Sequence, residues 1–534
     1  METISLYGSI AEELKKEVRG IRFQNRLSDA GRIVACGDGV LTIEGLPGVK
    51  NGELLYVGGD KYALTMNLEE NKVGAILLND SYELGEGDIA YSTGKIIGVP
   101  VGDMLLGRVV NPLGAPLDGG RPIVSKKYRP IEAPAPAIFD RASVNEPLLT
   151  GIKAIDSMIP IGKGQRELII GDRQTGKTAL AVDAIINQKG KNVLCVYVAI
   201  GQKIASVNSV VRTLKKHGAL DYTVVVCSTA SESAPLQYIA PYTGTAIAEE
   251  FMHSGRDVLI VYDDLSKHAV AYRAISLLLK RPSGREAYPG DIFYIHSRLL
   301  ERSAKLSESL GGGSLTALPI IETLAGDISA YIPTNVISIT DGQIYLESEL
   351  FRSGIRPAVN VGLSVSRVGG AAQCKAMKKV SGKVRLDLAH YREMAQFSQF
   401  GAELDASTKA TLGKGARLTE ILKQRQSSPV SMSHTVIALT VMMNDLFADV
   451  AVRDVNAVMD GFLDFLEANH PDLPARIEQT QALTDEDEAL IREYLGAYKG
   501  NISRLSGEVK AAQALARATA NADNENKNER GGNS

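Results

Sequence analysis

The stretch Gly171-Asp172-Arg173-Gln174-Thr175-Gly176-Lys177-Thr178 constrains the fold of this 534-residue chain more than any other feature. It has the G-x-x-x-x-G-K-[ST] spacing of a phosphate-binding loop. The apolar run 167–170 precedes it, and apolar residues at helical spacing follow it, at Leu180, Val182, Ile185 and Ile186. Because such a loop binds phosphate between a strand and a helix, this context predicts a nucleotide-binding α/β domain.

Each part of the loop suits a nucleotide phosphate. Its glycines let backbone N–H groups wrap around the β-phosphate, and the following helix directs its positive dipole at the same group. Lys177 spans the β- and γ-phosphates, and the Thr178 hydroxyl can bind Mg²⁺. The loop therefore predicts binding of a nucleotide together with its magnesium ion.

A carboxylate at the end of a neighbouring buried strand is the second part of such a site, and the run 258–263 supplies Asp263. Asp263 would hold Mg²⁺ through water. The alternative is that Asp263 and Asp264 only cap the helix that begins at Leu265, an interpretation that suits Asp264 well.

Hydrolysis of a bound nucleotide usually needs a further strand-end residue that orients the attacking water and accepts its proton. The plausible position follows the apolar run 196–200 and holds Gln202. An amide can orient water but cannot accept its proton near neutral pH. We therefore expect turnover here to be slow or absent, unless Gln202 is only a polar loop residue and the base lies elsewhere.

Composition argues against several other functions. The 59 Lys and Arg nearly balance the 62 Asp and Glu, and without a strongly basic block we expect no nucleic-acid partner. The four cysteines are far apart and lack zinc-site spacing. The apolar runs fall well short of the roughly 20 residues that a membrane span needs. We expect neither a zinc site nor membrane insertion.

Patterns along the chain predict three domains and a tail. Residues 1–95 combine a short exposed helix with closely spaced β-branched runs and turn signals, which favours a small antiparallel barrel or sandwich. In residues 96–370, apolar runs at 167–170, 193–198, 223–226 and 257–261 are typical of a parallel sheet buried on both faces. The same segment continues through the apolar runs 291–294 and 335–339.

Helical periodicity dominates residues 371–505. There Thr484 and Asp487 form a capping pair before a helix whose apolar side chains share one face. Residues 506–534 are expected to be disordered, because polar residues and glycine prevail near the end without apolar periodicity.

Several stretches beyond the phosphate loop resemble the alpha subunits of F-type ATP synthases. They are 198–203, 262–267, 314–319, 335–342 and, most specifically, 357–370. The resemblance covers roughly residues 25–426. It implies a multidomain chain with an N-terminal six-stranded β-barrel, a central α/β P-loop (RecA-like) domain with a parallel sheet, and a C-terminal α-helical bundle.

The resemblance also implies a regulatory subunit that binds ATP or ADP with Mg²⁺. The complex would make ATP from ADP and phosphate with a transmembrane proton or sodium gradient. In the family, alpha and beta chains alternate in a hexamer around a gamma shaft, and a delta subunit and peripheral stalk hold them. Beta carries a glutamate where this chain has Gln202, so the amide assigns this chain to the alpha type.

Two residues of the stretch 357–370 carry the catalytic contribution that the resemblance implies. The family arginine that matches Arg367 points across the interface at the γ-phosphate of the beta-bound nucleotide, and Ser364 is a position required for activity. A planar guanidinium suits this task because it donates several hydrogen bonds to developing negative charge. Taken alone, Arg367 would more often be a surface or ion-paired arginine.

For the adenine pocket, the family pattern implies Phe351, Arg356 and Pro357, with Gln424 and Gln426 from the helical domain. An aromatic ring and two amides suit a purine base. The alternative is core packing for Phe351 and a solvated helix end for the glutamines.

The likeness thins after Gln426, which leaves contacts with the shaft open, and the segment 4–19 is either a stalk-binding helix or a solvated one. Two rival functions remain. A self-sufficient hexameric motor, such as a helicase or secretion ATPase, would need a carboxylate at position 202, and a purely structural scaffold would not use Arg367. Because no transit-like segment precedes Ile4, we expect a peripheral membrane protein on the cytoplasmic face of a bacterial membrane or an equivalent organelle face.

Overall fold

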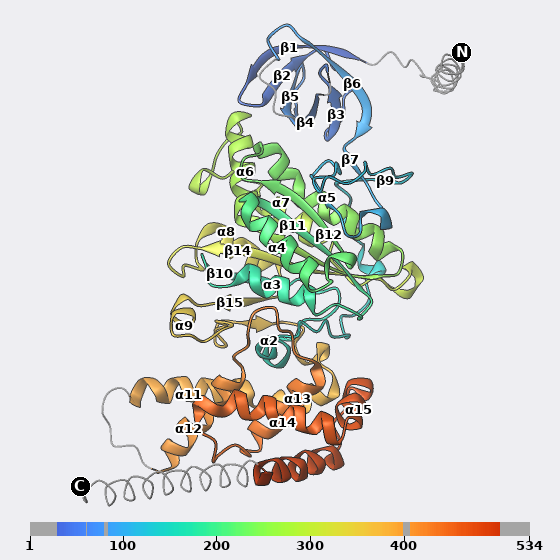
Figure 1. Ribbon diagram of the computed structural model, residues 1–534. Coiled ribbons are helices and arrows are strands. Elements are labelled where there is room, and N and C mark those ends of the chain that lie inside the picture. The colour runs from blue at the N-terminus through green and yellow to red at the C-terminus, as the bar shows by residue number, and fades with distance from the viewer. Residues whose placement is uncertain (1–28, 60, 79–83, 399–405, 502–534) are drawn as a thin grey trace, which may run out of the picture.

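The computed structural model describes residues 29–59, 61–78, 84–398 and 406–501. Figure 1 shows three layers stacked in chain order, with a β-barrel at one end, an α/β layer in the middle and a helical layer at the other end. The expected N-terminal helix and the expected tail 506–534 lie outside the described residues. The domain boundaries near residues 95 and 370 stay predictions.

Six antiparallel strands close the N-terminal barrel in the order β1-β2-β5-β4-β3-β6. Their bounds are β1 Ala30–Gly37, β2 Val40–Glu44, β3 Glu53–Tyr56, β4 Tyr62–Leu68, β5 Lys72–Leu77 and β6 Ile89–Ile96. Alternate side chains such as Leu41 and Ile43 are fully buried inside it. Closure pairs every strand on both sides, which confirms the barrel and removes the exposed edges that a sandwich would keep.

The middle layer is an eight-stranded sheet in the order β16-β15-β10-β14-β13-β11-β12-β8. Its bounds are β8 Val109–Val110, β10 Leu168–Asp172, β11 Val193–Gln202, β12 Thr223–Thr229, β13 Asp257–Asp263, β14 Ser314–Thr323, β15 Gly342–Leu346 and β16 Val365–Ser366. All neighbours are parallel except β15 and β16, which are antiparallel. A separate antiparallel pair joins β7 Gly98–Pro100 to β9 Tyr128–Pro130.

Helices cover both faces of this sheet, as Figure 1 shows. Their bounds are α2 Lys153–Met158, α3 Lys177–Ile186, α4 Ile204–Lys216, α5 Ala234–His253, α6 Leu265–Leu278, α7 Ile292–Leu300, α8 Tyr331–Ile339 and α9 Ser348–Arg352. On β10, Ile169 packs into one hydrophobic core while Leu168 and Ile170 pack into the other. Burial on both faces explains why these strands are continuous apolar runs.

The apolar runs 291–294 and 335–339, which the sequence groups with the strand-forming runs of this domain, fall in helices α7 and α8. Ile292, Ile295 and Leu299 share one buried helix face in α7. A window of four or five apolar residues is too short to separate helical from strand periodicity. The strand that sequence patterns missed is β14, in which Pro319 obscures an otherwise strand-like run.

Helices joined by loops form the described part of the C-terminal layer. Its helices are α10 Lys375–Ser381, α11 Val384–Ser398, α12 Ala406–Ile421, α13 Met432–Met443, α14 Val455–Asn469 and α15 Asp472–Thr480, followed by a helix at 485–501. The Thr484 backbone N–H donates to Asp487 Oδ2 at 2.9 Å, and the Asp487 N–H donates to Thr484 Oγ1 at 3.1 Å. This confirms the predicted capping pair.

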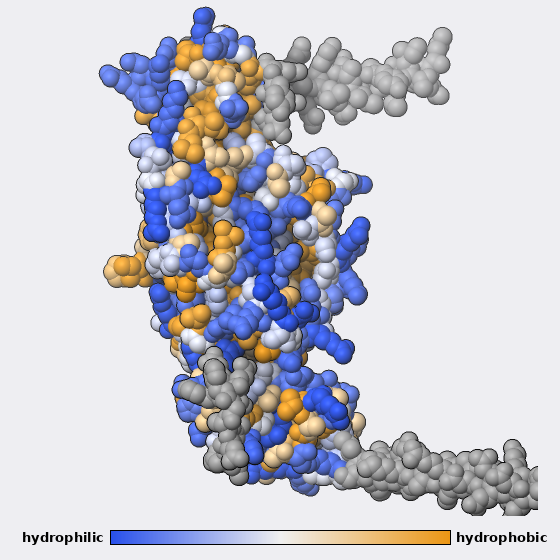
Figure 2. All heavy atoms as spheres, turned by 90° about the vertical axis from the view of Figure 1, so that its left-hand side faces the viewer, coloured by the Kyte–Doolittle hydropathy of each residue, from blue (hydrophilic) through white to orange (hydrophobic). Residues whose placement is uncertain are grey.

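One hydrophobic core runs from a face of the sheet into the helical layer, so these two layers pack as one body. Figure 2 shows polar and apolar side chains interspersed over one face of all three layers. Within the part of the chain that the structure describes, no helix combines the length and the apolarity that a membrane crossing requires.

Candidate nucleotide-binding site

A cavity of about 970 Å³ opens at the carboxyl edge of the sheet, where β10, β11 and β13 end, and the loop after α12 closes its other side. The predicted residues that line it are Arg173, Gln174, Thr175, Gly176, Lys177, Thr178, Gln202, Asp263, Phe351, Arg356, Pro357, Gln424 and Gln426. Residues from five distant segments thus meet in one place. The carboxyl ends of parallel strands are where open α/β sheets bind ligands.

The phosphate loop is already folded around its own backbone. Lys177 Nζ donates to the carbonyl oxygens of Gly171 and Asp172, at 2.8 and 2.5 Å, and Thr175 Oγ1 donates to the Asp172 carbonyl at 2.8 Å. A Cβ at position 171 would collide with the carbonyl oxygen of Leu346 on β15, so only glycine fits there. Gly176 supplies the left-handed φ of 98° from which α3 starts.

The Asp172 side chain faces the scaffold and does not line the cavity. Its Oδ1 accepts hydrogen bonds from Thr323 Oγ1 at 2.7 Å and from the Gly326 N–H at 2.8 Å, and its Oδ2 accepts one from Ser348 Oγ at 3.0 Å. Burial by itself would raise the pKa of Asp172, but these hydrogen bonds lower it below its ordinary value. Asp172 therefore fixes the loop to the ends of β14 and α9.

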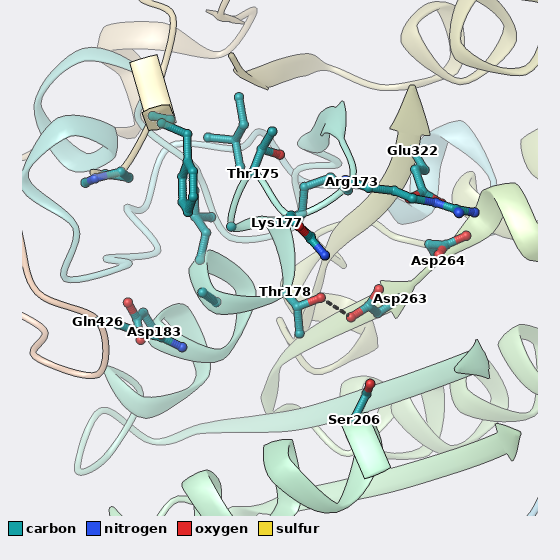
Figure 3. Close-up of a pocket in the computed structure, with 18 of the residues that line it drawn as sticks. Arg173, Thr175, Lys177, Thr178, Asp183, Ser206, Asp263, Asp264, Glu322 and Gln426 are labelled. Atoms are coloured by element: carbon teal, nitrogen blue, oxygen red, sulfur yellow. Dashed lines mark hydrogen bonds and ion pairs between the residues drawn. The ribbon is translucent and has the colours of Figure 1, made fainter. Parts of the chain in front are cut away.

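Asp263 is the polar centre of the site. It is 2% exposed at the end of β13. Its Oδ2 accepts a hydrogen bond from Thr178 Oγ1 at 2.7 Å (Figure 3). It also accepts one from the Tyr197 hydroxyl at 2.8 Å. Its Oδ1 accepts one from Gln202 Nε2 at 2.9 Å. A carboxylate and a hydroxyl in contact are hard oxygen groups of the kind that Mg²⁺ binds, so the residues fit this ion.

Asp264 has the capping role that the sequence suggested for it. Its Oδ1 accepts the backbone N–H of Lys267 at 2.8 Å, and Lys267 Nζ forms an ion pair with its Oδ2. Burial raises the pKa of Asp264. Asp264 therefore caps α6, whereas Asp263 faces Thr178. The two alternatives that the sequence left open apply to different residues.

Gln202 lies where β11 ends, as predicted, and its amide nitrogen donates to Asp263. A further carboxylate at the phosphate end is Glu322, which accepts a hydrogen bond from Arg173 Nε at 2.5 Å and lies near Asp263 and Asp264 (Figure 3). Sequence analysis missed Glu322 because it missed β14. A signal that could have found Glu322 is its place at the carboxyl end of β14, the strand next to the phosphate-loop strand β10, since ligands bind at this edge of a sheet.

The opposite end of the cavity holds the predicted base-binding residues. The Arg356 guanidinium lies 4.4 Å above the centre of the Phe351 ring. The Gln424 amide is used by backbone groups: Oε1 accepts the Lys153 N–H at 3.0 Å, and Nε2 donates to the Gly151 carbonyl at 2.7 Å. Gln424 thus ties the helical layer to the sheet layer, and Gln426 presents the second predicted amide.

Arg367 and Ser364 lie outside this cavity, near edge strand β16. Ser364 is fully buried; its hydroxyl donates to the Asn360 carbonyl at 2.6 Å and accepts the Tyr345 N–H at 2.9 Å. The Arg367 N–H donates to the Asp341 carbonyl at 2.8 Å, and the side chain is exposed. The Arg367 guanidinium makes no hydrogen bond or ion pair with any residue that the structure describes.

Comparison with known proteins identifies the family. Residues 151–366 match the ATP synthase alpha/beta family, nucleotide-binding domain, and residues 373–498 match the ATP synthase alpha/beta chain, C terminal domain. ATP synthase subunit alpha of Clostridium botulinum is 59% identical over 490 residues, which are 92% of this chain and 97% of the relative.

Two further relatives agree with this match at the same coverage of both chains. ATP synthase subunit alpha of Clostridium acetobutylicum is 57% identical, and that of Caldanaerobacter subterraneus is 59% identical. The chain therefore belongs to the ATP synthase alpha/beta family and, within it, to the F-type ATP synthase alpha subunits.

Proposed function

We propose that this chain retains a magnesium nucleotide in its own cavity without turning it over and lends Arg367 to the active site of a neighbouring subunit. The observation that carries the proposal is the contact between Gln202 and Asp263. A hydrogen-bond donor stands where a hydrolytic site needs a proton acceptor.

The cavity has the groups to bind and orient ATP or ADP. Lys177 Nζ is held by two carbonyl oxygens of the loop, and it can exchange these partners for phosphate oxygens. Thr178 and Asp263 would hold Mg²⁺, which neutralises phosphate charge when bound. The nearby carboxylates Asp264 and Glu322 are paired with Lys267 and Arg173, so neither is placed as a free base.

Arg367 suits a role in another subunit. Its backbone is fixed by Asp341, and its segment is braced by the buried Ser364 hydroxyl, so we assign Ser364 as a positioning residue. The guanidinium itself is exposed and makes no hydrogen bond or ion pair with a described residue. Such an arginine can donate to the charge that develops on a transferring phosphoryl group across an interface.

In the assembly that this function implies, alpha and beta subunits alternate around a gamma shaft, with a delta subunit and peripheral stalk outside. Rotation of the shaft would change how closely Arg367 approaches the beta phosphate site, and so would couple a proton or sodium gradient to ATP synthesis. Association with the cytoplasmic face of the membrane would come through the complex.

The direct test is to purify the full chain alone and measure both nucleotide retention and phosphate release with Mg²⁺ and ATP. We expect tightly held nucleotide and no turnover above background. Brisk phosphate release would instead favour a self-sufficient motor. Loss of all bound nucleotide during gel filtration would contradict the retention role.

A further inference from the structure

Asp183 is a cavity residue that neither the motif nor the family resemblance singles out. It lies on α3, the helix that starts at the phosphate loop, and is 8% exposed. Figure 3 places Asp183 beside Gln426, on the side of Lys177 and Thr178 away from Asp263. This is the end of the cavity where a base would lie when the phosphates occupy the loop.

Only one of the two Asp183 carboxylate oxygens has a partner. Oδ1 accepts the backbone N–H of Ser427 at 2.9 Å, in the loop that also carries Gln424 and Gln426. No hydrogen bond from any described residue reaches Oδ2. Burial raises the pKa of Asp183 to about 6. Oδ2 is thus open to the cavity, where a donor group of a bound ligand could reach it and offset the cost of burying the carboxylate.

A second buried acid shows what a purely structural carboxylate looks like in this fold. Asp156 on α2 is 7% exposed. Its Oδ1 accepts the backbone N–H and the hydroxyl of Thr150, at 2.9 and 2.6 Å, and its Oδ2 accepts the Gly151 N–H at 2.9 Å. Both oxygens of Asp156 are thus used inside the protein, whereas Asp183 keeps one for the cavity.

We propose that Asp183 is a specificity-determining residue that accepts a hydrogen bond from the exocyclic amino group of a 6-aminopurine nucleotide. A 6-oxopurine would place a carbonyl oxygen against the same carboxylate, and two acceptors repel each other. The inference rests on the proposed retention of nucleotide in this cavity. It adds a named residue that selects the base.

The test compares binding of ATP and of inosine triphosphate, which differ at position 6 of the purine, to the purified full chain with Mg²⁺ by equilibrium dialysis. We expect the wild-type chain to prefer ATP by roughly 10- to 100-fold, the range for one matched against one mismatched buried hydrogen bond. In Asp183→Asn, the amide oxygen can still accept the Ser427 N–H, while the amide nitrogen turns a donor toward the base. The preference should fall to about one or reverse.

Two variants separate recognition from structure. Asp156→Asn should leave the ratio of the two affinities unchanged, and Asp183→Ala should weaken both nucleotides and remove the preference. An unchanged ratio in Asp183→Asn would overturn the assignment of Asp183. If the wild-type chain held neither nucleotide, the retention function itself would fail, and the two failures are therefore distinguishable.

Discussion

The nucleotide cavity and the Arg367 segment of this chain present their polar groups in opposite ways. In the cavity, Lys177, Thr178 and Gln202 all make hydrogen bonds to the protein before any ligand is considered. In the Arg367 segment the backbone is tied down and the guanidinium is left exposed. Under the proposed function, the cavity holds a nucleotide inside this chain and Arg367 acts outside it.

The difference shows that binding and catalysis can be assigned to different surfaces of one subunit. A site that only retains nucleotide needs pre-formed contacts to phosphate and base, which the cavity has. A site that accelerates phosphoryl transfer needs charge placed where the transition state develops it. Under the proposed function, Arg367 is the charge that serves this task, at a nucleotide that another chain binds.

The largest expected effect separates the two regions directly. Arg367→Ala should lower the turnover of the assembled complex by roughly 1,000- to 100,000-fold, because an arginine finger contributes on that scale. Nucleotide retained in the cavity of this chain should not change. The measurement is steady-state ATP hydrolysis of the complex together with a count of bound nucleotide per alpha chain.

The matched control for Arg367 is Arg352→Ala. Arg352 is also exposed, lies shortly before the same stretch and has no hydrogen bond or ion pair to a described residue. Its removal should leave turnover within about twofold of wild type, as for surface substitutions away from a site. Intact turnover in Arg367→Ala would support the scaffold alternative, in which this chain takes no part in the chemistry.

The second-largest expected effect is a loss of nucleotide binding in the cavity, with Arg367 left unchanged. Lys177→Ala removes charge-assisted hydrogen bonds to phosphate and should weaken nucleotide retention by roughly 100-fold or more. The complex should still assemble and turn over in part, because Arg367 is untouched. Nucleotide content after gel filtration and residual hydrolysis are the two measurements.

Lys203→Ala tests whether charge alone explains such a loss. Lys203 lines the same cavity at its rim, is exposed, and makes no side-chain hydrogen bond or ion pair to a described residue. Its removal should affect retention far less than the loss of Lys177. Dissociation of the whole complex in Lys177→Ala would show that the bound nucleotide is a structural element, contrary to the expectation here.

The sequence predicts an element well when residues within that element alone determine its pattern. The strands β10, β11, β12 and β13 are long apolar runs between turns, and the patterns found all four. Strand β14 is not apparent in the sequence because Pro319 interrupts its pattern. The sequence also does not show that α7 and α8 are helices, because short apolar windows carry no clear period. The packing that decides these cases involves residues far away in the chain.

The site follows the same rule. The phosphate loop and Asp263 belong to one motif and its strand-end companion, so spacing was enough to predict them. The hydrogen bond from Tyr197 to Asp263 and the tie between Asp183 and Ser427 join residues 66 and 244 positions apart. No local pattern marks such partners. The sequence also could not show that the Gln424 amide hydrogen-bonds to backbone groups. Those contacts depend on how the helical layer packs against the sheet layer.

The smallest expected effect concerns the stability of the empty cavity. The ordinary pKa of an aspartate is 3.8, and burial raises that of Asp183 to about 6, so the folded chain binds this proton more tightly than the unfolded chain. Stability is therefore highest below the lower value and falls as the pH rises through about 6. At pH 8, Asp183→Asn should melt about 1–3 °C above wild type without nucleotide, because it removes a buried charge worth about 1–3 kcal/mol.

At pH 5 this offset should shrink to about half, because the folded chain then binds most of this proton while the unfolded chain, whose aspartate has its ordinary pKa of 3.8, is still mostly ionised. Asp156→Asn should instead destabilise the chain at both pH values, because Asp156 uses both oxygens as acceptors and the amide would replace one acceptor with a donor. Saturating ATP should reverse the order at pH 8, because it stabilises the tighter-binding wild type more. An equal offset between wild type and Asp183→Asn at both pH values would mean that the charge of Asp183 does not set this cost, and the contrast between a cavity kept ready for a base and an ordinary buried acid would then be lost.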